Sequence, residues 1–597
     1  MHQITRVFDL LPYNHENFDK PILIAGKTAG KWVNYSTDDL ISHANKVSRG
    51  LIKLGIKKDS MVANMSANRP EWNFVDFGIM QIGAVHVPMY PTLPENDIKF
   101  IMNDAGVEIL FVATADLYNK VASVRNEIPT LREIYSYEKI EGVKHWSEVL
   151  EMGSAEPLEN LQPYQDNVQP DDLLTLIYTS GTTGTPKGVM LTHDNLVSNF
   201  KSSGPLVPLN NDAKALSFLP LSHIFERMVV YMYLSKGISI HYAESMETIS
   251  DNLKEVKPNV FSTVPRLLEK VYDRIVAKGH KLTGIKKQLF FWALKLGLKY
   301  EFDGANGWWY ETQLKIARKL IFSKWKEALG NNVFAIISGG AALQPRLARV
   351  FAAAGMPALE GYGLTETSPV ISVNQPYKGM AMFGSVGPTI EHVQIKIAED
   401  GEVLCKGPNV MKGYYKRPDL TAETIDADGW FHTGDIGTIV DNKFLKITDR
   451  KKEIFKTAGG KYIAPQVLEN KLKESPLIEQ LIVIGENERF AAALIVPTFT
   501  ALKDWCERKN IVYSNPEEMI KNPDVIEKIQ IEVDKCNVGL GKWETIKKFE
   551  LLPKEWSIDS GELTPKLSLK RKVIMQKYKL NVDNIYANAE KLDSQKA

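Results

Sequence analysis

Short apolar runs alternate with longer helix-compatible segments through most of this chain, and this alternation is the strongest constraint on its fold. The runs read ILFVA at 109–113, LLTLIYT at 173–179, ALSFL at 215–219, ISIHY at 238–242, NVFSTV at 259–264 and VFAIIS at 333–338. Strands that alternate with helices form largely parallel sheets in layers, so the sequence predicts an α/β fold. Ligands of such sheets bind outside the carboxyl ends of the strands. Glycine-rich segments that directly follow two of these runs are therefore candidate binding loops.

The N-terminal region carries a helix with recognisable ends. Its apolar residues at helical spacing are Leu40, Ala44, Val47 and Leu51. Either Ser36 or Thr37 would serve as the N-cap, and Gly55 would end the helix.

The chain has 597 residues, which is too many for one ordinary core, so we expect at least two domains. We predict a large N-terminal domain of layered α/β subdomains at 1–448 and a small C-terminal α+β domain at 449–597. The second part opens with a short, charged and glycine-punctuated segment. A helix that begins near Pro465 and a hairpin at 481–496 follow it. The polar last residues, 584–597, are expected to fray.

Composition excludes several classes of function. The net charge of +1 gives no global field that would favour nucleic acid. The three cysteines form no CxxC motif, so neither a disulfide framework nor a zinc site is indicated. The N-terminus carries acids and lacks an apolar core, so it does not read as a signal peptide. With no segment apolar enough to span a bilayer, a reducing cytoplasmic location is the expectation.

Residues 178–189 read YTSGTTGTPKGV, a loop rich in glycine and hydroxyl groups that follows a strand-like run. Glycines let backbone N–H groups face an anion, hydroxyls donate to phosphate oxygens, and Lys187 adds positive charge. The candidate phosphate-binding residues are Thr179, Ser180, Gly181, Thr182, Thr183, Gly184 and Lys187. This is not a Walker A loop, because Gly188 follows the lysine where that loop has Ser or Thr. A plain turn is the alternative, and the length of the string argues against it.

Further motifs follow this loop. They read LPLSHIFER at 219–227, ISGGAAL at 337–343, GYGLTET at 361–367, TGDIG at 433–437, ITDRKKEI at 447–454, KTAGGKYIAP at 456–465 and LTPKLSLKRK at 563–572. With the loop, they resemble the motifs of the adenylate-forming superfamily, which contains acyl-CoA synthetases, luciferases and the adenylation domains of peptide synthetases. The resemblance spans nearly the whole chain. It implies ATP, Mg²⁺ and coenzyme A as co-substrates and cofactor, and a C-terminal domain that acts as a mobile lid.

The resemblance also implies roles for single residues. Glu366 would hold Mg²⁺, and Thr365 would contact the α-phosphate. The adenine would lie against Tyr362 and the small residues Gly339, Gly340 and Ala341, and Gly363 is a further candidate cofactor-binding residue. Tight helix–strand packing is the alternative reason for the small residues. Asp435 would accept hydrogen bonds from the ribose hydroxyls, with Arg450 beside it, because a carboxylate accepts two bonds and donates none.

The remaining implied roles concern the acyl group and the lid. His223 would lie beside the substrate carboxylate, although a structural histidine is an equal alternative. Lys570 would enter the adenylation site, with Lys566 as the second choice and a simple basic patch as the alternative. Lys452 would be the hinge of the lid. Gly459 and Gly460 would line a tunnel for the pantetheine thiol.

A helix-compatible insertion at about 276–332, rich in Lys, Trp and Phe, indicates which acid is used. It resembles the long-chain acyl-CoA synthetases, so the expected substrates are a long-chain fatty acid, ATP and coenzyme A. Its basic, amphipathic character suits a membrane surface, and an ordinary packed helical pair is the alternative. The oligomeric state stays open, with a homodimer among the options.

Three other functions remain as alternatives. The first is a fatty acyl-AMP ligase that loads a carrier protein. The second is an aryl-acid or medium-chain ligase, against which the insertion argues. The third is a non-enzymatic fatty-acid-binding or uptake protein with a vestigial nucleotide site. The intact set of charged residues argues against it, because a vestigial site has no reason to keep every charged position that the chemistry needs.

Overall fold

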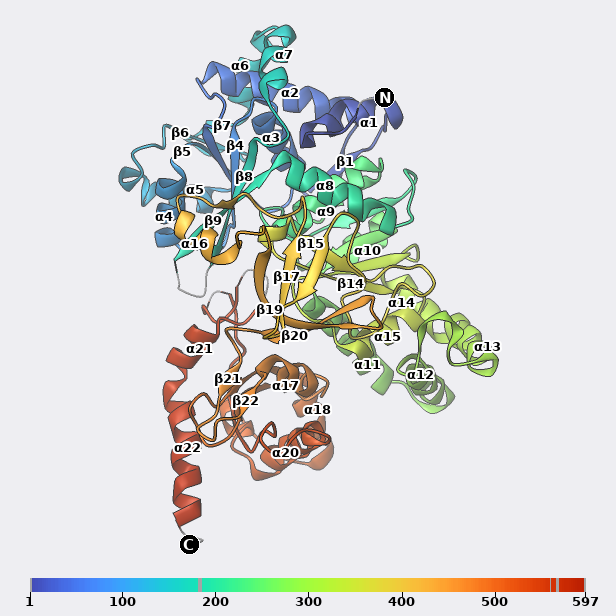
Figure 1. Ribbon diagram of the computed structural model, residues 1–597. Helices are drawn as coiled ribbons and strands as arrows, with labels where there is room; N and C mark the ends of the chain where they lie inside the picture. The colour runs from blue at the N-terminus through green and yellow to red at the C-terminus, as the bar shows by residue number, and fades with distance from the viewer. Residues whose placement is uncertain (1–2, 181–184, 559, 565–567, 595–597) are drawn as a thin grey trace.

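The computed structural model describes residues 3–180, 185–558, 560–564 and 568–594 (Figure 1). Two large sheets form the N-terminal part. The first contains, in spatial order, β15 (Val370–Val373), β14 (Ala358–Gly363), β13 (Ala335–Ser338), β12 (Val260–Thr263), β10 (Lys214–Ser217), β11 (Ser239–Tyr242), β1 (Ile24–Thr28) and β2 (Lys31–Tyr35). The strands from β14 to β1 pair in parallel.

The second large sheet contains the other predicted strands. Its spatial order is β18 (Gly413–Tyr414), β9 (Pro186–Thr192), β8 (Leu173–Ser180), β4 (Val85–Met89), β3 (Met61–Met65), β5 (Val107–Val112), β6 (Glu133–Ser136) and β7 (Lys144–His145). All its pairs from β8 to β7 are parallel, whereas β8 and β9 form an antiparallel hairpin. The prediction of an α/β fold with largely parallel sheets is confirmed.

Helices α3 (Pro70–Met80), α8 (His193–Ser203) and α9 (Ile224–Ser235) lie beside the sheets and bury most of their side chains in the largest core (Figure 1). Helix α2 (Thr37–Lys53) begins as predicted, and Ser36 is its N-cap because its side chain accepts from the N–H of Asp39. The helix buries Leu40, Ala44, Val47 and Leu51, and Gly55 follows it in the left-handed region with φ 80°.

The insertion is helical along most of its length. It contains the end of α11 (Pro265–His280), then α12 (Gly284–Gly297), α13 (Trp308–Ala317), the π-helical turn η6 (Arg318–Phe322) and α14 (Ser323–Ala328). One face packs into a second core through residues such as Leu314, Phe322 and Trp325. These helices stand at the edge of the molecule (Figure 1).

A third, four-stranded antiparallel sheet leads to the C-terminal part. Its order is β16 (Gln394–Ile397), β17 (Glu402–Lys406), β19 (Phe431–Val440) and β20 (Phe444–Arg450). The predicted division at 448/449 falls near the end of β20, and the division stays a prediction. The short pair β21 (Phe455–Lys456) and β22 (Tyr462–Ile463) follows.

The C-terminal part has its own α+β core. It contains α17 (Pro465–Leu472), the predicted hairpin of β23 (Ile478–Ile484) and β24 (Ala492–Pro497), then α18 (Phe499–Lys509), α20 (Pro523–Asn537), β25 (Lys548–Leu551), α21 (Arg571–Lys577) and α22 (Lys579–Ser594). Both the helix start at Pro465 and the hairpin are confirmed. Contacts with the N-terminal part include an ion pair between Arg266 and Glu479 and a hydrogen bond from Gln344 to the carbonyl of Lys473.

The prediction that the last residues fray is wrong for much of the segment. Helix α22 continues to Ser594 and buries Val582, Ile585, Tyr586 and Ala589. Val582, Ile585 and Tyr586 recur at helical spacing and share one core cluster with apolar residues of β23 and β24. The polar residues between them hid this stripe.

Two further observations concern membrane-spanning helices and the cysteines. In the described part of the chain, no helix is long and apolar enough to cross a membrane. Cys405, Cys506 and Cys536 are free and buried. Burial raises the pKa of the Cys405 thiol to about 12, so this group stays protonated and unreactive near neutral pH.

Candidate functional site

The predicted phosphate loop lies at the tip of the β8–β9 hairpin. In this hairpin Thr179 pairs with Lys187, and Ser180 pairs with Pro186. Gly181, Thr182, Thr183 and Gly184 lie outside the described residues. The hairpin therefore holds Thr179 and Lys187 on opposite sides of the loop's base.

Lys187, Tyr414 and Glu366 form a connected group beside this hairpin. The ammonium of Lys187 lies 4.3 Å from the ring centroid of Tyr414, a distance at which the ring face attracts a cation. The Tyr414 hydroxyl donates to Oε1 of Glu366 at 2.8 Å. Strand β18 brings Tyr414 here because Tyr414 pairs with Val189 of β9. One oxygen of Glu366 is thus oriented by protein, next to a cationic side chain.

Charge around Lys187 agrees with this arrangement. Burial lowers the pKa of Lys187, the charge of Glu366 opposes this shift, and the positive charge of Lys452 adds to it. The predicted phosphate lysine, the predicted Mg²⁺ carboxylate and the predicted hinge therefore lie close enough to interact. Thr365, next to Glu366, is buried.

Tyr362, Asp435 and Arg450 form a second group. The Tyr362 hydroxyl donates to Oδ2 of Asp435 at 2.6 Å. Asp435 pairs with Arg450 across β19 and β20, where Arg450 Nε lies 3.5 Å from Oδ1. Burial raises the pKa of Asp435, and the charge of Arg450 opposes this. Among the weaker causes of the same shift is Glu366, so the two groups are electrostatically linked.

His223 is the N-cap of α9. Its Nδ1 accepts from the backbone N–H of Phe225 at 3.0 Å, so the neutral ring carries its proton on Nε2. The Phe225 ring packs against Gly339, where an added Cβ would lie 3.1 Å from the ring. Gly339 therefore has to be a small residue because the Phe225 ring packs against it. This packing places the glycine loop directly beside the helix that His223 caps.

The other small residues differ in how much space surrounds them. A Cβ on Gly363 would lie 1.7 Å from the carbonyl oxygen of Pro369, so no side chain fits there. Gly340 has a φ of 81°, a conformation that side chains disfavour. Ala341 is exposed. Packing explains Gly363, whereas Gly340 and Ala341 leave an open backbone.

Lys570 lies in the C-terminal part, immediately before α21, and reaches toward the N-terminal part. Burial raises the pKa of Asp97 in α4 (Glu95–Ala105), and the charge of Lys570 opposes this. The carboxylate on which the charge of Lys570 acts is thus Asp97, whereas Glu366 interacts with Lys187 and Tyr414. Lys566, the second choice, lies outside the described residues.

Arg571, next to Lys570, has a structural role that sequence reasoning missed. It donates to Glu453 at 2.9 Å and to Glu469, and it also reaches the carbonyl of Val483. Glu453 lies in the turn that carries Lys452, so Arg571 joins the predicted lysine segment to the predicted hinge. The acidic residue Glu453 in the motif ITDRKKEI was the one sequence feature that could have indicated a basic partner for this turn. Lys452, Gly459 and Gly460 are exposed.

Behind α9 lies a fully buried ionic network. Asp76 accepts from Arg227 and from the Tyr231 hydroxyl, and it contacts His86 at 2.6 Å. All four side chains are excluded from solvent. Arg227 belongs to the LPLSHIFER motif, so part of this motif anchors α9 and thereby positions His223.

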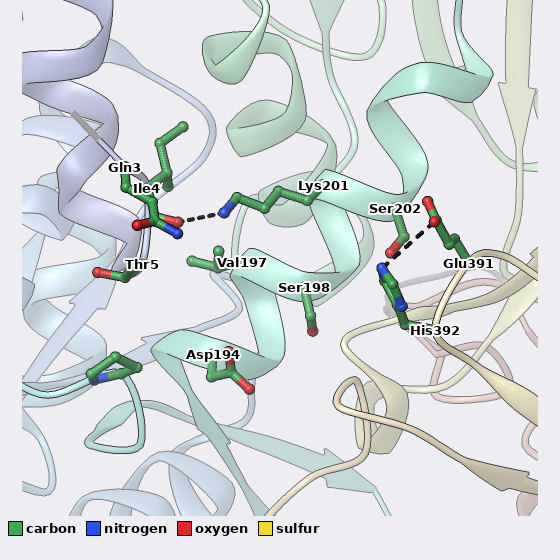
Figure 2. Close-up of a pocket in the computed structure, with 11 residues that line it drawn as sticks. Gln3, Ile4, Thr5, Asp194, Val197, Ser198, Lys201, Ser202, Glu391 and His392 are labelled. Atoms are coloured by element: carbon green, nitrogen blue, oxygen red, sulfur yellow. Dashed lines mark hydrogen bonds and ion pairs between the residues drawn. The ribbon is translucent and has the colours of Figure 1, made fainter. Parts of the chain in front are cut away.

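A separate hollow of about 390 Å³ lies between the N-terminal segment and α8 (Figure 2). In it Lys201 donates to the carbonyl of Ile4, and Glu391 lies beside His392. None of the described residues assigned to nucleotide binding lines this hollow, so it is distinct from the candidate site.

The described residues agree with a Mg²⁺ ion held mainly by phosphates. Within these residues, only the exposed group His15, Asp19 and Asp38 brings three possible metal ligands together, and it is remote in sequence from every nucleotide motif. At the candidate site Glu366 offers a carboxylate whose orientation Tyr414 holds. Mg²⁺ in nucleotide sites commonly uses one or two carboxylates plus phosphate oxygens, so this single carboxylate fits.

Comparison with known structures shows the same fold. The anthranilate CoA ligase AuaEII, solved with anthranoyl-AMP, aligns with a TM-score of 0.73 at 18% identity over 97% of this chain and 98% of that one. The adenylation domain of a carboxylate reductase from Mycobacterium chelonae aligns with a TM-score of 0.76 at 22% identity, over 98% of this chain and 91% of that one.

Sequence comparison is more specific. The AMP-binding enzyme family matches residues 13–415, and the AMP-binding enzyme C-terminal domain matches residues 453–590. The long-chain-fatty-acid–CoA ligase FadD15 of Mycobacterium bovis is 33% identical over 581 residues, 96% of each chain. Human long-chain-fatty-acid–CoA ligase 1 is 34% identical over 591 residues, covering 93% of this chain and 82% of the human protein. The chain belongs to the AMP-binding enzyme family and, within it, to the long-chain acyl-CoA synthetases.

Proposed function

We propose that this protein uses ATP to activate a long-chain fatty acid as acyl-AMP, with release of pyrophosphate, and then transfers the acyl group to coenzyme A. The observation that carries this proposal is the convergence of Lys187, Tyr414 and Glu366 beside the β8–β9 hairpin. This group offers charge for a triphosphate next to the Tyr362–Asp435 pair, which suits a nucleoside. Relatives named as long-chain-fatty-acid–CoA ligases support the choice of acid.

The first half-reaction brings two anions together. Lys187 and the donors of the loop offset the repulsion between the carboxylate and the triphosphate. Glu366 would hold Mg²⁺, which supplies positive charge to the phosphates. Thr365 donates to the α-phosphate, and Asp435 accepts from the ribose hydroxyls. His223 positions the substrate carboxylate through its Nε2–H.

The second half-reaction requires a different arrangement of the lid. We assign the lid to 449–597 and its hinge to Lys452, and we assign adenylation to Lys570. Turning about the hinge withdraws Lys570 and brings Gly459 and Gly460 to the acyl-AMP, where the thiol enters. Arg571 binds Glu453 and Glu469, so it holds the Lys570 segment against the hinge turn. The two segments therefore move together.

Half-reaction assays with the Lys570→Ala variant test this assignment. Pyrophosphate release should fall by about 10²–10³-fold, because a close charge at the reacting phosphate is lost. Acyl-CoA formation from supplied acyl-AMP should fall far less. Lys572→Ala is the matched control, because Lys572 is exposed in the same segment. Equal loss in both half-reactions would show that the assignment to Lys570 is wrong.

A chain-length series of fatty acids, with and without coenzyme A, tests the overall function. Acyl-CoA formation that peaks with long chains is the expected result. Accumulation of acyl-AMP without acyl-CoA would indicate a carrier-protein acceptor. Fatty acid binding without pyrophosphate release would indicate a vestigial nucleotide site.

A further inference from the structure

The N-terminal and C-terminal parts each bury an apolar core of their own. Among the described residues, no core cluster combines residues that precede Lys452 with residues that follow it. Two parts without a shared core can separate without exposing that core to water. The polar contacts between the two parts therefore decide how they are oriented.

The first of these contacts joins α11 to β23. The guanidinium of Arg266 pairs with Glu479 of the C-terminal part and also donates to Glu269 of its own helix at 3.0 Å. The side chains of Arg266 and Glu479 are only 21% and 13% exposed. Salt screens a shielded pair of this kind less than it screens a pair on the open surface. The pair can therefore hold the two parts together at physiological ionic strength.

A second contact lies at the carboxyl end of α17. Lys473 is the C-cap residue of this helix, and its carbonyl accepts from Nε2 of Gln344 at 3.3 Å and from Nη2 of Arg346 at 3.4 Å. The last carbonyls of a helix lack partners within the helix and carry partial negative charge. An amide and a guanidinium supply the missing donors here. The N-terminal part thus caps a helix of the C-terminal part.

Glu269 joins the two contacts into one network. Its Oε2 accepts from Arg266, and its Oε1 accepts from Nε2 of Gln344 at 2.8 Å. Arg346, in α15 (Pro345–Ala353), donates to Oε1 of Gln344 at 2.7 Å. Each side chain therefore orients the next. The groups of this network, which we call the latch, are Arg266, Glu269, Gln344 and Arg346 from the N-terminal part and Glu479 and the carbonyl of Lys473 from the C-terminal part.

The latch is built on segments that lead out of the candidate site. Arg266 follows Thr263, whose carbonyl accepts from the N–H of Gly339 at 3.2 Å. Gln344 follows Leu343, whose N–H donates to the buried Glu360 at 2.8 Å, directly before the GYG segment at 361–363. The latch therefore fixes the C-terminal part relative to the glycine segment of the candidate site.

In the orientation that the latch holds, Lys570 faces the N-terminal part, because its charge opposes the raised pKa of Asp97. Helix α17 lies on the side of the C-terminal part that faces the N-terminal part (Figure 1). The other end of α11 approaches α18: burial lowers the pKa of His280, and the positive charges of Lys287 and Arg508 add to this shift. A turn of the C-terminal part about Lys452 must therefore break the latch.

We propose that Arg266, Gln344 and Arg346 are positioning residues. Through Glu479 and the carbonyl of Lys473, they hold the C-terminal part in the orientation in which Lys570 faces the N-terminal part. The latch opens before the C-terminal part turns. This proposal deepens the proposed function, and its consequence for the two half-reactions rests on that function.

Distances between spin labels test the latch without ATP, fatty acid or coenzyme A. The labels are attached through Ile285→Cys in α12 and Val512→Cys in the C-terminal part, whose side chains are 74% and 92% exposed. The three native cysteines are buried. With the latch intact, one distance should dominate. Arg266→Met and Glu479→Gln should each shift the ratio of this distance to other distances by about tenfold, because a charged hydrogen bond is lost.

A double variant and two matched controls make the shift specific. Arg266→Met/Glu479→Gln should shift the ratio no further than either single variant, because both changes remove the same pair. Arg274→Met and Glu474→Gln make the same chemical changes at exposed residues of α11 and of the segment between Lys473 and Glu479, and they should leave the distances unchanged.

Gln344→Leu removes a donor of the second contact. It should shift the ratio in the same direction as Arg266→Met, so the test does not depend on Arg266 alone.

Three results of the distance measurement would overturn the proposal. They are a protein with an intact latch whose distances are as widely spread as those of the variants, single variants that keep the original ratio, and shifts that add up in the double variant.

Half-reaction assays report on the proposed function separately. In Arg266→Met and Glu479→Gln, pyrophosphate release should fall more than acyl transfer from supplied acyl-AMP. Equal changes in both half-reactions would show that the latch does not position Lys570. A shift in distance in a protein that releases no pyrophosphate with any fatty acid would support the latch and contradict the proposed function.

Discussion

Replacing Arg571 by methionine tests whether this residue, which follows Lys570, holds the C-terminal part together. Arg571 donates to Glu453 at 2.9 Å, to the carbonyl of Val483 at 3.1 Å and to Glu469. The Glu469 side chain is only 5% exposed, whereas that of Glu453 is 24% exposed. Methionine preserves much of the volume but leaves the buried Glu469 with no cation.

Removal of one partner from a buried ion pair costs about 3–5 kcal/mol. Most of this cost falls on Glu469, which then keeps, among the described residues, only the N–H of Val483 as a donor at 2.7 Å. Differential scanning calorimetry should show the unfolding transition of the C-terminal part lowered by about 10 °C or more, given the size of this part of the chain. Adenylation should fall as well, because Lys570 loses its anchored neighbour.

Two variants make the result interpretable. Arg571→Lys keeps the charge but cannot reach both carboxylates with one fork, so its stability should be intermediate. Lys572→Met changes an exposed neighbour and should leave the transition within about 1 kcal/mol of the wild type. If Arg571→Met were as stable as Lys572→Met, the argument that Arg571 joins the hinge to α21 would fail.

Two more predictions concern the N-terminal part. Burial raises the pKa of Glu226 to about 7 from 4.5, despite hydrogen bonds from Ser217 and Ser262, so the folded state holds this proton more tightly than the unfolded state. The wild type therefore loses stability as pH rises from about 4.5 to 7, and Glu226→Gln should gain about 3 kcal/mol of stability relative to the wild type over that window. Urea titrations measure the free energy of unfolding of both proteins at pH 5 and at pH 8. A difference between the two proteins that is the same at both pH values would contradict this prediction. Tyr414→Phe keeps the ring below Lys187 but removes the donor to Glu366, so the KM for ATP at fixed Mg²⁺ should rise roughly tenfold, while Tyr415→Phe changes little. Steady-state kinetics of both variants check this, and an unchanged KM in Tyr414→Phe would remove Tyr414 from the site.

The sequence predicted the elements best where the signal was local. The cap and stripe of α2, the start of α17 and the hairpin of β23 and β24 were all readable, because capping, turns and periodicity depend on neighbours in the chain. Helix α22 was missed because its apolar stripe is thin and becomes meaningful only against β23 and β24.

The candidate site was readable as a set of motifs but not as a set of contacts. Glu366, Asp435 and Lys187 stood out because glycines and hydroxyls surround them. Tyr414 belongs to none of the motifs, and it lies near Lys187 only because β18 pairs with β9. The packing of Phe225 on Gly339 is of the same kind.

The sequence by itself thus determined the α/β architecture, the order of the motifs and the charged groups that nucleotide chemistry needs. Tertiary structure decided which of these groups touch, which glycines are required by packing, and which side chains join the C-terminal part to the N-terminal part. The physical reason is the range of the interactions. Helix periods and caps act over a few residues, whereas strand register and side-chain packing join positions that are hundreds of residues apart.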